Sequence, residues 1–331
     1  MTGRANDFAT LQPARVLSRT ALRYDAGADV NTDRPAHVRA GSGLCVVDVP
    51  GLGPRLAVVQ DDAAFIALID PASLRVDVVT LPAGPNGARQ FDKRRNNKMD
   101  KFDLESVVAV VVSDRPALLC VGSGSAPVRE RFVVVRFGDE GPEVRNLKAS
   151  RLFDELRRRR DFAGDELNIE GAVVVGDRLH LFNRGNGAGF AVDAVIDFSL
   201  RQLLQHLEDP SVNATPSLGV VRAYDLGSIA GTRLTFTDAT LHPDGRTLFL
   251  AAAEASPNAV DDGEVVGTAV GILHDDGRVT LRRLVDETGE PLIDKVEGIA
   301  VDPLRPDRAF VVVDKDDADT AAELLVVQLL D

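Results

Sequence analysis

Short apolar runs recur along the whole chain, and polar turn sequences separate them. Valine and leucine dominate the runs, and the turns include GDR (176–178), HPDGRT (242–247) and HDDGRV (274–279). Short apolar runs bounded by glycine, aspartate and proline are typical of β-strands, whereas helices need longer runs with a period near 3.6. The pattern therefore predicts an all-β fold.

Five of these runs open with similar sequences at nearly regular intervals. Their anchor positions are Ser42, Glu105, Glu170, Asp238 and Glu297, separated by 63, 65, 68 and 59 residues. Two further apolar runs and a weaker fourth follow each opening, except that the last unit stops before a fourth run. Regular recurrence on this scale indicates a repeat architecture.

The N-terminal stretch 14–24 reads as a strand without a partner of its own, and we expect it to complete the last unit. A ring of sheets closed in this way leaves few exposed strand edges, as in a β-propeller. We therefore predict one β-propeller domain over residues 1–331, with five four-stranded blades. Six blades remain the alternative if residues 1–41 form more than one strand. Short helices are expected at 150–160 and 199–209.

The first strand of each propeller blade lines the central channel, so the five anchors should converge at one channel mouth. Four of them are acidic: Glu105, Glu170, Asp238 and Glu297. Carboxylates brought this close raise one another's pKa unless a cation lies between them. Ca²⁺ accepts about six to eight oxygen ligands in a loose geometry, so we predict these four as ligands of a divalent metal, Ca²⁺ first. Simple strand-end capping is the alternative.

Basic residues are expected near the same mouth. Residues 88–101 carry six basic and two acidic side chains and lead directly into Glu105, so this basic loop should cover the mouth and hold an anion. Lys101, Arg184 and Lys315 are predicted to neutralise charge during catalysis, and structural salt bridges are the alternative for Arg184 and Lys315. Glu170 is predicted to move protons. The further candidates for substrate binding are Asp103, Arg129, Arg131 and Asn183.

Composition narrows the range of partners. A net charge of −13 argues against nucleic acid or an anionic membrane as the main partner, because both attract basic surfaces. Cys45 and Cys120 lie in apolar runs and are expected to be buried free thiols. The N-terminus has no apolar signal region, and no stretch is long enough to span a bilayer, so a cytoplasmic location is expected. A protein partner cannot be predicted.

The openings DLES, NIEGA and KVEGIAVDP, together with LTFTDATLHPDGRTLFLAAAEAS, resemble the bacterial phytase-like (esterase-like) β-propellers and related uncharacterised cytoplasmic propellers. A weaker similarity extends to lactonases of the gluconolactonase type. The resemblance covers about residues 42–331. It implies a calcium or other divalent ion at the channel mouth, held by the four acidic anchors. The chain differs from secreted phytase-like members in lacking a signal peptide, and from the lactonases in blade count and in having no asparagine anchor.

The sequence thus predicts a metal-dependent hydrolase that acts on an anionic small molecule, with a phosphate ester as the first choice. One alternative is a non-catalytic propeller that binds a ligand or a protein and uses its metal or salt bridges structurally. The other alternative is hydrolysis of a lactone or another ester. Metal content and the product released from a substrate panel would separate the three hypotheses.

Overall fold

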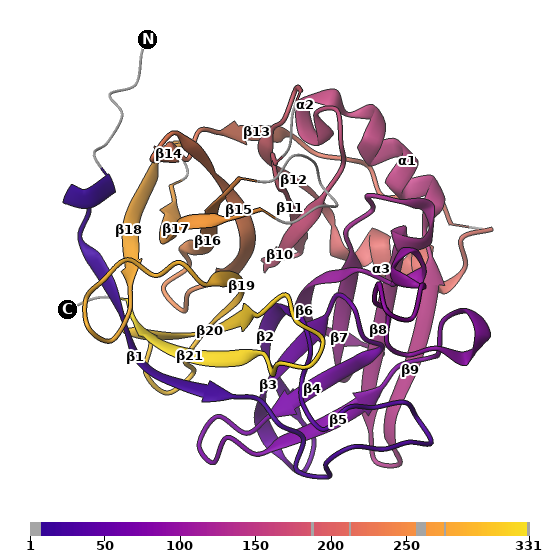
Figure 1. The fold of residues 1–331 in the computed structure, drawn as a ribbon. Coiled ribbons are helices and arrows are strands. Elements are labelled where there is room, and N and C mark those ends of the chain that lie inside the picture. Colours follow the sequence, from indigo (N-terminus) through magenta and orange to yellow (C-terminus); the bar gives the residue numbers. More distant parts are fainter. Residues whose placement is uncertain (1–7, 187–188, 212, 256–262, 275, 330–331) are drawn as a thin grey trace.

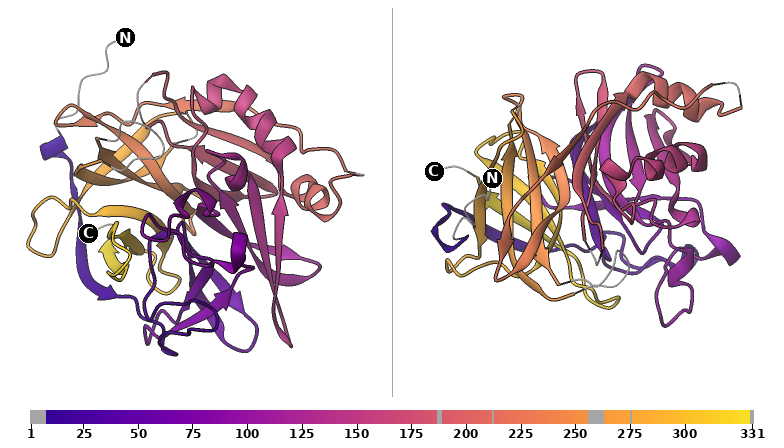
Figure 2. Two further views of the ribbon diagram at one scale, coloured as in Figure 1. Left: turned by 45° about the vertical axis from the view of Figure 1, so that its right-hand side comes forward. Right: turned by 90° about the horizontal axis from the view of Figure 1, so that it is seen from above.

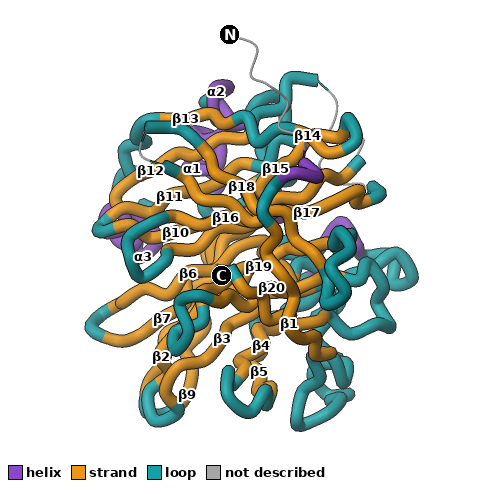
Figure 3. Tube along the Cα trace, turned by 90° about the vertical axis from the view of Figure 1, so that its left-hand side faces the viewer, coloured by secondary structure: helices purple, strands orange, loops and turns teal. Residues whose placement is uncertain are grey.

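The fold is a β-propeller, whose antiparallel sheets stand around a central channel (Figure 1). It is seen in a computed structural model that describes residues 8–186, 189–211, 213–255, 263–274 and 276–329. Strands are the main secondary structure, and the few α-helices lie on the outside of the sheets (Figures 1 and 3). Among the described residues, no helix has the length and hydropathy needed to cross a membrane.

Three blades are separate four-stranded sheets whose strands follow one another in chain order. The first contains β2 (Gly41–Val49), β3 (Gly53–Gln60), β4 (Phe65–Ile69) and β5 (Val76–Thr80). The second contains β6 (Leu104–Val112), β7 (Arg115–Gly122), β8 (Arg131–Gly138) and β9 (Gly141–Lys148). The third contains β10 (Ile169–Val175), β11 (Arg178–Asn183), β12 (Asp193–Ser199) and β13 (Val221–Tyr224).

The remaining strands form one nine-stranded sheet that consists of two four-stranded groups and the short β14 (Ser228–Ile229). One group is β15 (Thr232–Leu241), β16 (Thr247–Glu254), β17 (Val265–Leu273) and β18 (Val279–Val285). The other is β19 (Lys295–Val301), β20 (Arg308–Asp314), β21 (Glu323–Gln328) and the N-terminal β1 (Pro13–Ala21).

Strand β1 lies beside the C-terminal strands (Figures 1 and 2). It pairs antiparallel with β21 and, over Pro13–Arg15, parallel with β18, so it joins the two groups into one sheet. Residues 22–40 add isolated bridges, such as Arg23 with His37, rather than a further strand.

The helices are insertions between strands. Helices α1 (Ser150–Arg158) and α2 (Arg160–Ala163) lie between β9 and β10, and α3 (Leu200–Glu208) follows β12. The Oγ of Ser199 accepts a hydrogen bond from the Gln202 amide and so caps α3. Four 3₁₀ helices complete the described elements: η1 (Phe8–Thr10), η2 (Pro85–Gly87), η3 (Lys98–Asp100) and η4 (Pro127–Arg129).

The core lies between neighbouring blades, where the apolar faces of adjacent sheets pack together. Cys45 and Cys120 belong to the same cluster between the first and second blades, and both are buried free thiols as expected. The innermost strands are β2, β6, β10, β15 and β19; each contacts the next, and β19 contacts β2. These five strands therefore enclose the channel.

A β-bulge interrupts every inner strand at its anchor position or, in β15, one residue before it. The extra residue is Glu105 in β6, Glu170 in β10, Thr237 in β15 and Glu297 in β19, and in β2 the register shifts between Gly41 and Leu44, around Ser42. The structural counterpart of the glutamates in the fourth blade is thus Thr237, whereas Asp238 lies one residue later and pairs with Leu250. The sequence alignment of that unit is wrong by one residue.

In β2 and β19 a glycine follows the bulge because neighbouring inner strands come very close there. A Cβ atom on Gly43 would lie 2.5 Å from the Cα of Ser106, and one on Gly298 would lie 2.3 Å from the backbone oxygen of Ser42. Only glycine fits such an approach. The bulges and the glycines together explain how carboxylate side chains stand at the start of strands that are otherwise buried.

Candidate functional site

A cavity of ≈ 310 Å³ lies at the channel mouth, bounded by the inner strands, the ends of the second strands and the basic loop 88–101. Its described lining contains eleven acidic and eight basic side chains, so most of its polar groups are charged. The acidic ones are Asp61, Asp62, Asp92, Asp103, Glu105, Glu170, Glu254, Glu297, Asp314, Asp316 and Asp317. The basic ones are Arg39, Lys93, Arg94, Lys98, Lys101, Arg129, Arg184 and Lys295.

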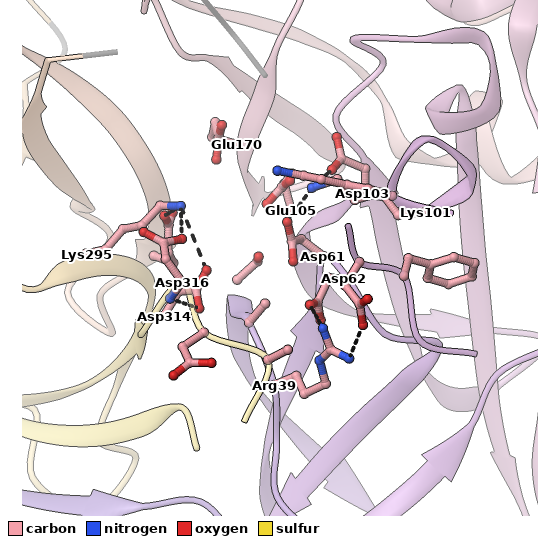
Figure 4. A pocket seen from close by; sticks show the side chains of 18 of the residues that line it. Arg39, Asp61, Asp62, Lys101, Asp103, Glu105, Glu170, Lys295, Asp314 and Asp316 are labelled. Atoms are coloured by element: carbon pink, nitrogen blue, oxygen red, sulfur yellow. Dashed lines mark hydrogen bonds and ion pairs between the residues drawn. The ribbon is translucent and has the colours of Figure 1, made fainter. Parts of the chain in front are cut away.

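On one side of the cavity, Lys101 lies between Asp61 and Asp103 (Figure 4). The Lys101 Nζ is 2.5 Å from Asp61 Oδ2 and 2.5 Å from Asp103 Oδ1. The other oxygen of Asp103 lies 2.9 Å from Arg129 Nη1 and accepts a hydrogen bond from Ser123. Asp103 has a φ of 56°, in the left-handed region, which aspartate tolerates better than most residues.

These contacts determine the protonation states of Asp103 and Lys101. Burial alone would raise the pKa of Asp103, but Lys101 and Arg129 hold it at about 2. Burial would likewise lower the pKa of Lys101, but Asp103, Asp61 and Glu105 raise it well above its usual range. Asp103 is therefore ionised and Lys101 is an ammonium ion at neutral pH.

Glu105 stands next to this pair without a counter-ion of its own. Carboxylate oxygens of Asp61, Asp103 and Glu105 lie within 4.8 Å of one another, and the Glu105 carboxylate forms no hydrogen bond or ion pair with any described residue. Burial and the charges of Asp103 and Glu170 raise the pKa of Glu105 well above its usual range. The Lys101 ammonium opposes this shift, and a proton or a bound cation would relieve what remains of it.

Glu170 is held by two neighbours. The Asn168 Nδ2 donates a hydrogen bond to Glu170 Oε1 at 2.6 Å, and the Arg184 Nη1 lies 3.5 Å from the same oxygen. Arg184 also pairs with Glu254 and donates to the Thr235 hydroxyl at 3.2 Å. Burial raises the pKa of Glu170 to about 7 although Arg184 opposes the shift, so Glu170 exchanges a proton near neutral pH.

The opposite side of the cavity is built around Lys295, which the sequence analysis missed (Figure 4). Its Nζ lies 2.8 Å from Asp316, 3.7 Å from Glu297 and 3.8 Å from Asp314. Burial raises the pKa of both Glu297 and Asp314 well above their usual ranges, although Lys295 opposes each shift. The available signal was the position of Lys295 two residues before Glu297, on the same face of β19.

Arg39 is a second cavity residue that the sequence did not reveal. Its side chain is 1% exposed, pairs with Asp62 and Asp92, and donates to Gln90 at 2.8 Å. It precedes β2 in a stretch with no strand pattern, so nothing in the sequence marked it. Arg39 attaches the start of the basic loop to the first blade.

Seven of the predicted site residues line the cavity: Lys101, Asp103, Glu105, Arg129, Glu170, Arg184 and Glu297. Four others do not belong to its described lining. Lys315 lies 2.9 Å from Asp294 and 2.8 Å from Glu323, because it follows Asp314 and so points to the other side of the strand.

The remaining three have contacts away from the cavity. The Arg131 guanidinium lies 4.3 Å from the centre of the Phe102 ring. The Asn183 Oδ1 accepts a hydrogen bond from the Asn168 amide at 2.8 Å, so Asn183 supports the segment that carries Glu170. Asp238 is 1% exposed, and its Oδ2 accepts a hydrogen bond from the Ile299 amide at 2.9 Å, across two inner strands.

Fold and site together define a β-propeller with a charged cavity at its channel mouth. Within that class, the chain belongs to a family of unknown function, DUF6929, whose model matches residues 37–329. No curated protein matches the sequence.

Several solved structures are distantly similar. A mannose phosphorylase from Leishmania mexicana, in complex with phosphate ion, is 12% identical with a TM-score of 0.47 over 94% of this chain and 88% of that one. A calcium-binding regucalcin from Agrobacterium tumefaciens is 10% identical with a TM-score of 0.43, covering 96% of each chain. A gluconolactonase from Xanthomonas campestris is 12% identical with a TM-score of 0.36, over 96% of this chain and 98% of that one. These similarities are too distant to transfer a site or an activity.

Proposed function

We propose that this protein is a metal-dependent hydrolase that acts on an anionic small molecule at the channel mouth, with phosphate esters as the substrate class. The observation that carries the proposal is Glu105, a carboxylate without a hydrogen bond or ion pair to any described residue, placed within 4.8 Å of oxygens of Asp61 and Asp103. The phytase-like resemblance of the sequence is the reason for naming phosphate esters first.

The residues present fit a hard divalent cation. The carboxylates of Asp61, Asp103 and Glu105 offer oxygen ligands, which Ca²⁺ prefers. The Oδ1 atom of Asp61 is buried without a hydrogen-bond partner, which is the condition that a cation would relieve. The Oδ1 atom of Asp103 lies against the Lys101 ammonium instead. A divalent ion bound there would polarise a scissile group or lower the pKa of a water molecule. We take Ca²⁺ as the first candidate.

Proton transfer in this proposal belongs to Glu170. Its pKa of about 7 matches a group that takes and returns a proton at neutral pH. Asn168 and Arg184 hold its carboxylate in place by the contacts described above, which makes them positioning residues. Glu297, on β19, lines the same cavity near Lys295 and adds a further acidic group to it.

Binding of an anion belongs to the basic side of the cavity. Lys93, Lys98 and Lys101 of the basic loop and Arg129 line it together. The Nε and Nη2 of Arg129 have no hydrogen-bond partner among the described residues, while its Nη1 is fixed by Asp103 and by Ser125 at 2.7 Å. Guanidinium and ammonium groups are the usual partners of phosphate and carboxylate oxygens.

The test is hydrolysis of a substrate panel with and without metal. Phosphate monoesters and lactones are each offered with added Ca²⁺, Mn²⁺ or Mg²⁺ and again with chelator. We expect phosphate release that needs metal and is lost in Glu170→Gln but kept in Lys315→Met, a charge removed outside the cavity. Acid release from lactones alone would support lactone or ester hydrolysis, and no turnover of any substrate would contradict the hydrolase.

A non-catalytic binding propeller is the second candidate. The observation in its favour is that Lys101, Arg184 and Lys295 each lie between two or more carboxylates, so the charges of the mouth are largely compensated internally. In that case the salt bridges hold the blades together and the cavity only binds its ligand. Absence of turnover together with saturable binding of an anion would favour this candidate.

A further inference from the structure

Lys101 already occupies the position that a metal ion would need. Its Nζ contacts Asp61 Oδ2 and Asp103 Oδ1, both at 2.5 Å, and these residues are two of the three proposed metal ligands. The residue is 7% exposed. An ammonium ion and a divalent ion cannot both lie among the same oxygens, because the two cations repel each other strongly in a partly dehydrated site.

We propose that Lys101 is a built-in competitor of the metal: a divalent cation that binds Asp61, Asp103 and Glu105 displaces the Lys101 ammonium, which then becomes available to an anionic substrate. This inference rests on the proposed function and adds an order of binding to it. Without the metal, Lys101 neutralises the carboxylates; with the metal, Lys101 contributes positive charge to the cavity. The cation therefore prepares the site for the anion.

The local structure permits this exchange through the side chain alone. Phe102, the next residue, is 5% exposed, its ring centre lies 5.9 Å from that of Phe91 in a tilted arrangement, and the Arg131 guanidinium covers its face. The backbone after Lys101 is therefore anchored. A lysine side chain has a flexible four-carbon stem, and Lys101 borders the same cavity as Lys93 and Lys98. Rotation of the side chain moves the ammonium away from the carboxylates without moving the loop.

The first test compares Ca²⁺ affinity by isothermal titration calorimetry in the wild-type protein and in Lys101→Met. We expect the variant to bind Ca²⁺ at least about tenfold more tightly, because no ammonium has to be displaced. Lys315→Met is the control: Lys315 is also an ion-paired lysine, 2.9 Å from Asp294 and 2.8 Å from Glu323, but it lies outside the described lining of the cavity. Its affinity should equal that of the wild type. An equal or weaker affinity in Lys101→Met would overturn the inference.

Lys101→Met removes the ion pair of Asp61 and leaves Asp103 with Arg129 alone, so folding of the variant needs its own control. Lys101→Gln keeps a hydrogen-bond donor and serves if the methionine variant does not fold. A second measurement uses the wild-type protein: acetylation of Lys101 by an amine-reactive reagent, followed by mass spectrometry. The buried ammonium should be protected without Ca²⁺ and become reactive at saturating Ca²⁺. Protection that persists in a Ca²⁺-saturated protein would refute the displacement.

The outcomes separate this inference from the proposed function. If the wild type binds Ca²⁺ but neither the affinity of the variants nor the reactivity of Lys101 changes, the competition is refuted while the metal site stands. If the Lys101 variants bind Ca²⁺ and the wild type does not, the competition is supported, and Lys101 replaces the metal permanently, which contradicts metal-dependent hydrolysis. If no form of the protein binds Ca²⁺, both ideas fail together.

Discussion

Arg184 connects two carboxylates that belong to different blades, Glu170 on β10 and Glu254 at the end of β16. All three side chains are at most 7% exposed. Arg184→Met should remove the cation that these two buried carboxylates share, and losing one partner of a buried ion pair costs about 3–5 kcal/mol. With an unfolding entropy of about 2.1 cal/mol/K per residue over 331 residues, the melting temperature should fall by about 4–7 °C.

Thermal unfolding at neutral pH provides the assay, with two comparisons. Arg184→Met/Glu254→Gln removes the charge of Glu254 together with that of Arg184 and should recover a large part of the loss. Lys315→Met removes a lysine whose side chain is 23% exposed and should cost less than about 1 kcal/mol. A change below about 1 °C in Arg184→Met, or a double variant less stable than the single one, would refute the reasoning that Arg184 compensates both carboxylates.

Two further predictions concern buried acids. The pKa of Glu170 is about 7 in the folded protein, compared with 4.5 for an unperturbed glutamate in the unfolded chain. The stability that the protonated side chain contributes is therefore complete below pH 4.5 and is lost as the pH rises through 7. Glu170 should contribute a loss of about 1.4 kcal/mol per pH unit to the free energy of unfolding in this window, and Glu170→Gln should reduce the slope measured by denaturant unfolding by that amount; an unchanged slope would contradict this. Burial also raises the pKa of Asp238, so Asp238→Asn should change the free energy of unfolding by less than about 1 kcal/mol, whereas Asp238→Ala should cost about 1–3 kcal/mol by leaving the Ile299 amide unpaired. Equal losses in both variants would exclude a protonated, hydrogen-bonded Asp238.

The β-propeller fold could be predicted from the sequence because the inner strands begin with similar short sequences. Apolar runs at a spacing near 65 residues identify the blades, and a first strand must face the channel whatever its neighbours are. The same argument brought Glu105, Glu170 and Glu297 to one cavity. The argument failed for the group β15–β18. A β-bulge there makes Thr237 the counterpart of these glutamates, and the pattern of apolar and polar residues does not reveal where a bulge lies.

The charge partners were harder to assign because they depend on side-chain direction and on loops. Lys315 and Lys295 both border acidic residues in the sequence, yet alternation along the strand brings Lys295 to the cavity and turns Lys315 to Asp294 and Glu323. Arg39 gives no periodic signal at all, since it lies in an irregular segment. Its role follows only from the tertiary contact with Asp62 and Asp92.

The central claim is that Glu105 completes a cation site with Asp61 and Asp103. Calorimetric titration with Ca²⁺ of the wild type and of Glu105→Gln tests it most directly. The raised pKa of Glu105 means that the neutral amide should not destabilise the metal-free protein, so a change in binding reports on the site. We predict that the wild type binds Ca²⁺ and that Glu105→Gln loses this binding while keeping its melting temperature. A wild type that binds no Ca²⁺, or a variant that binds it with unchanged affinity, would contradict the account.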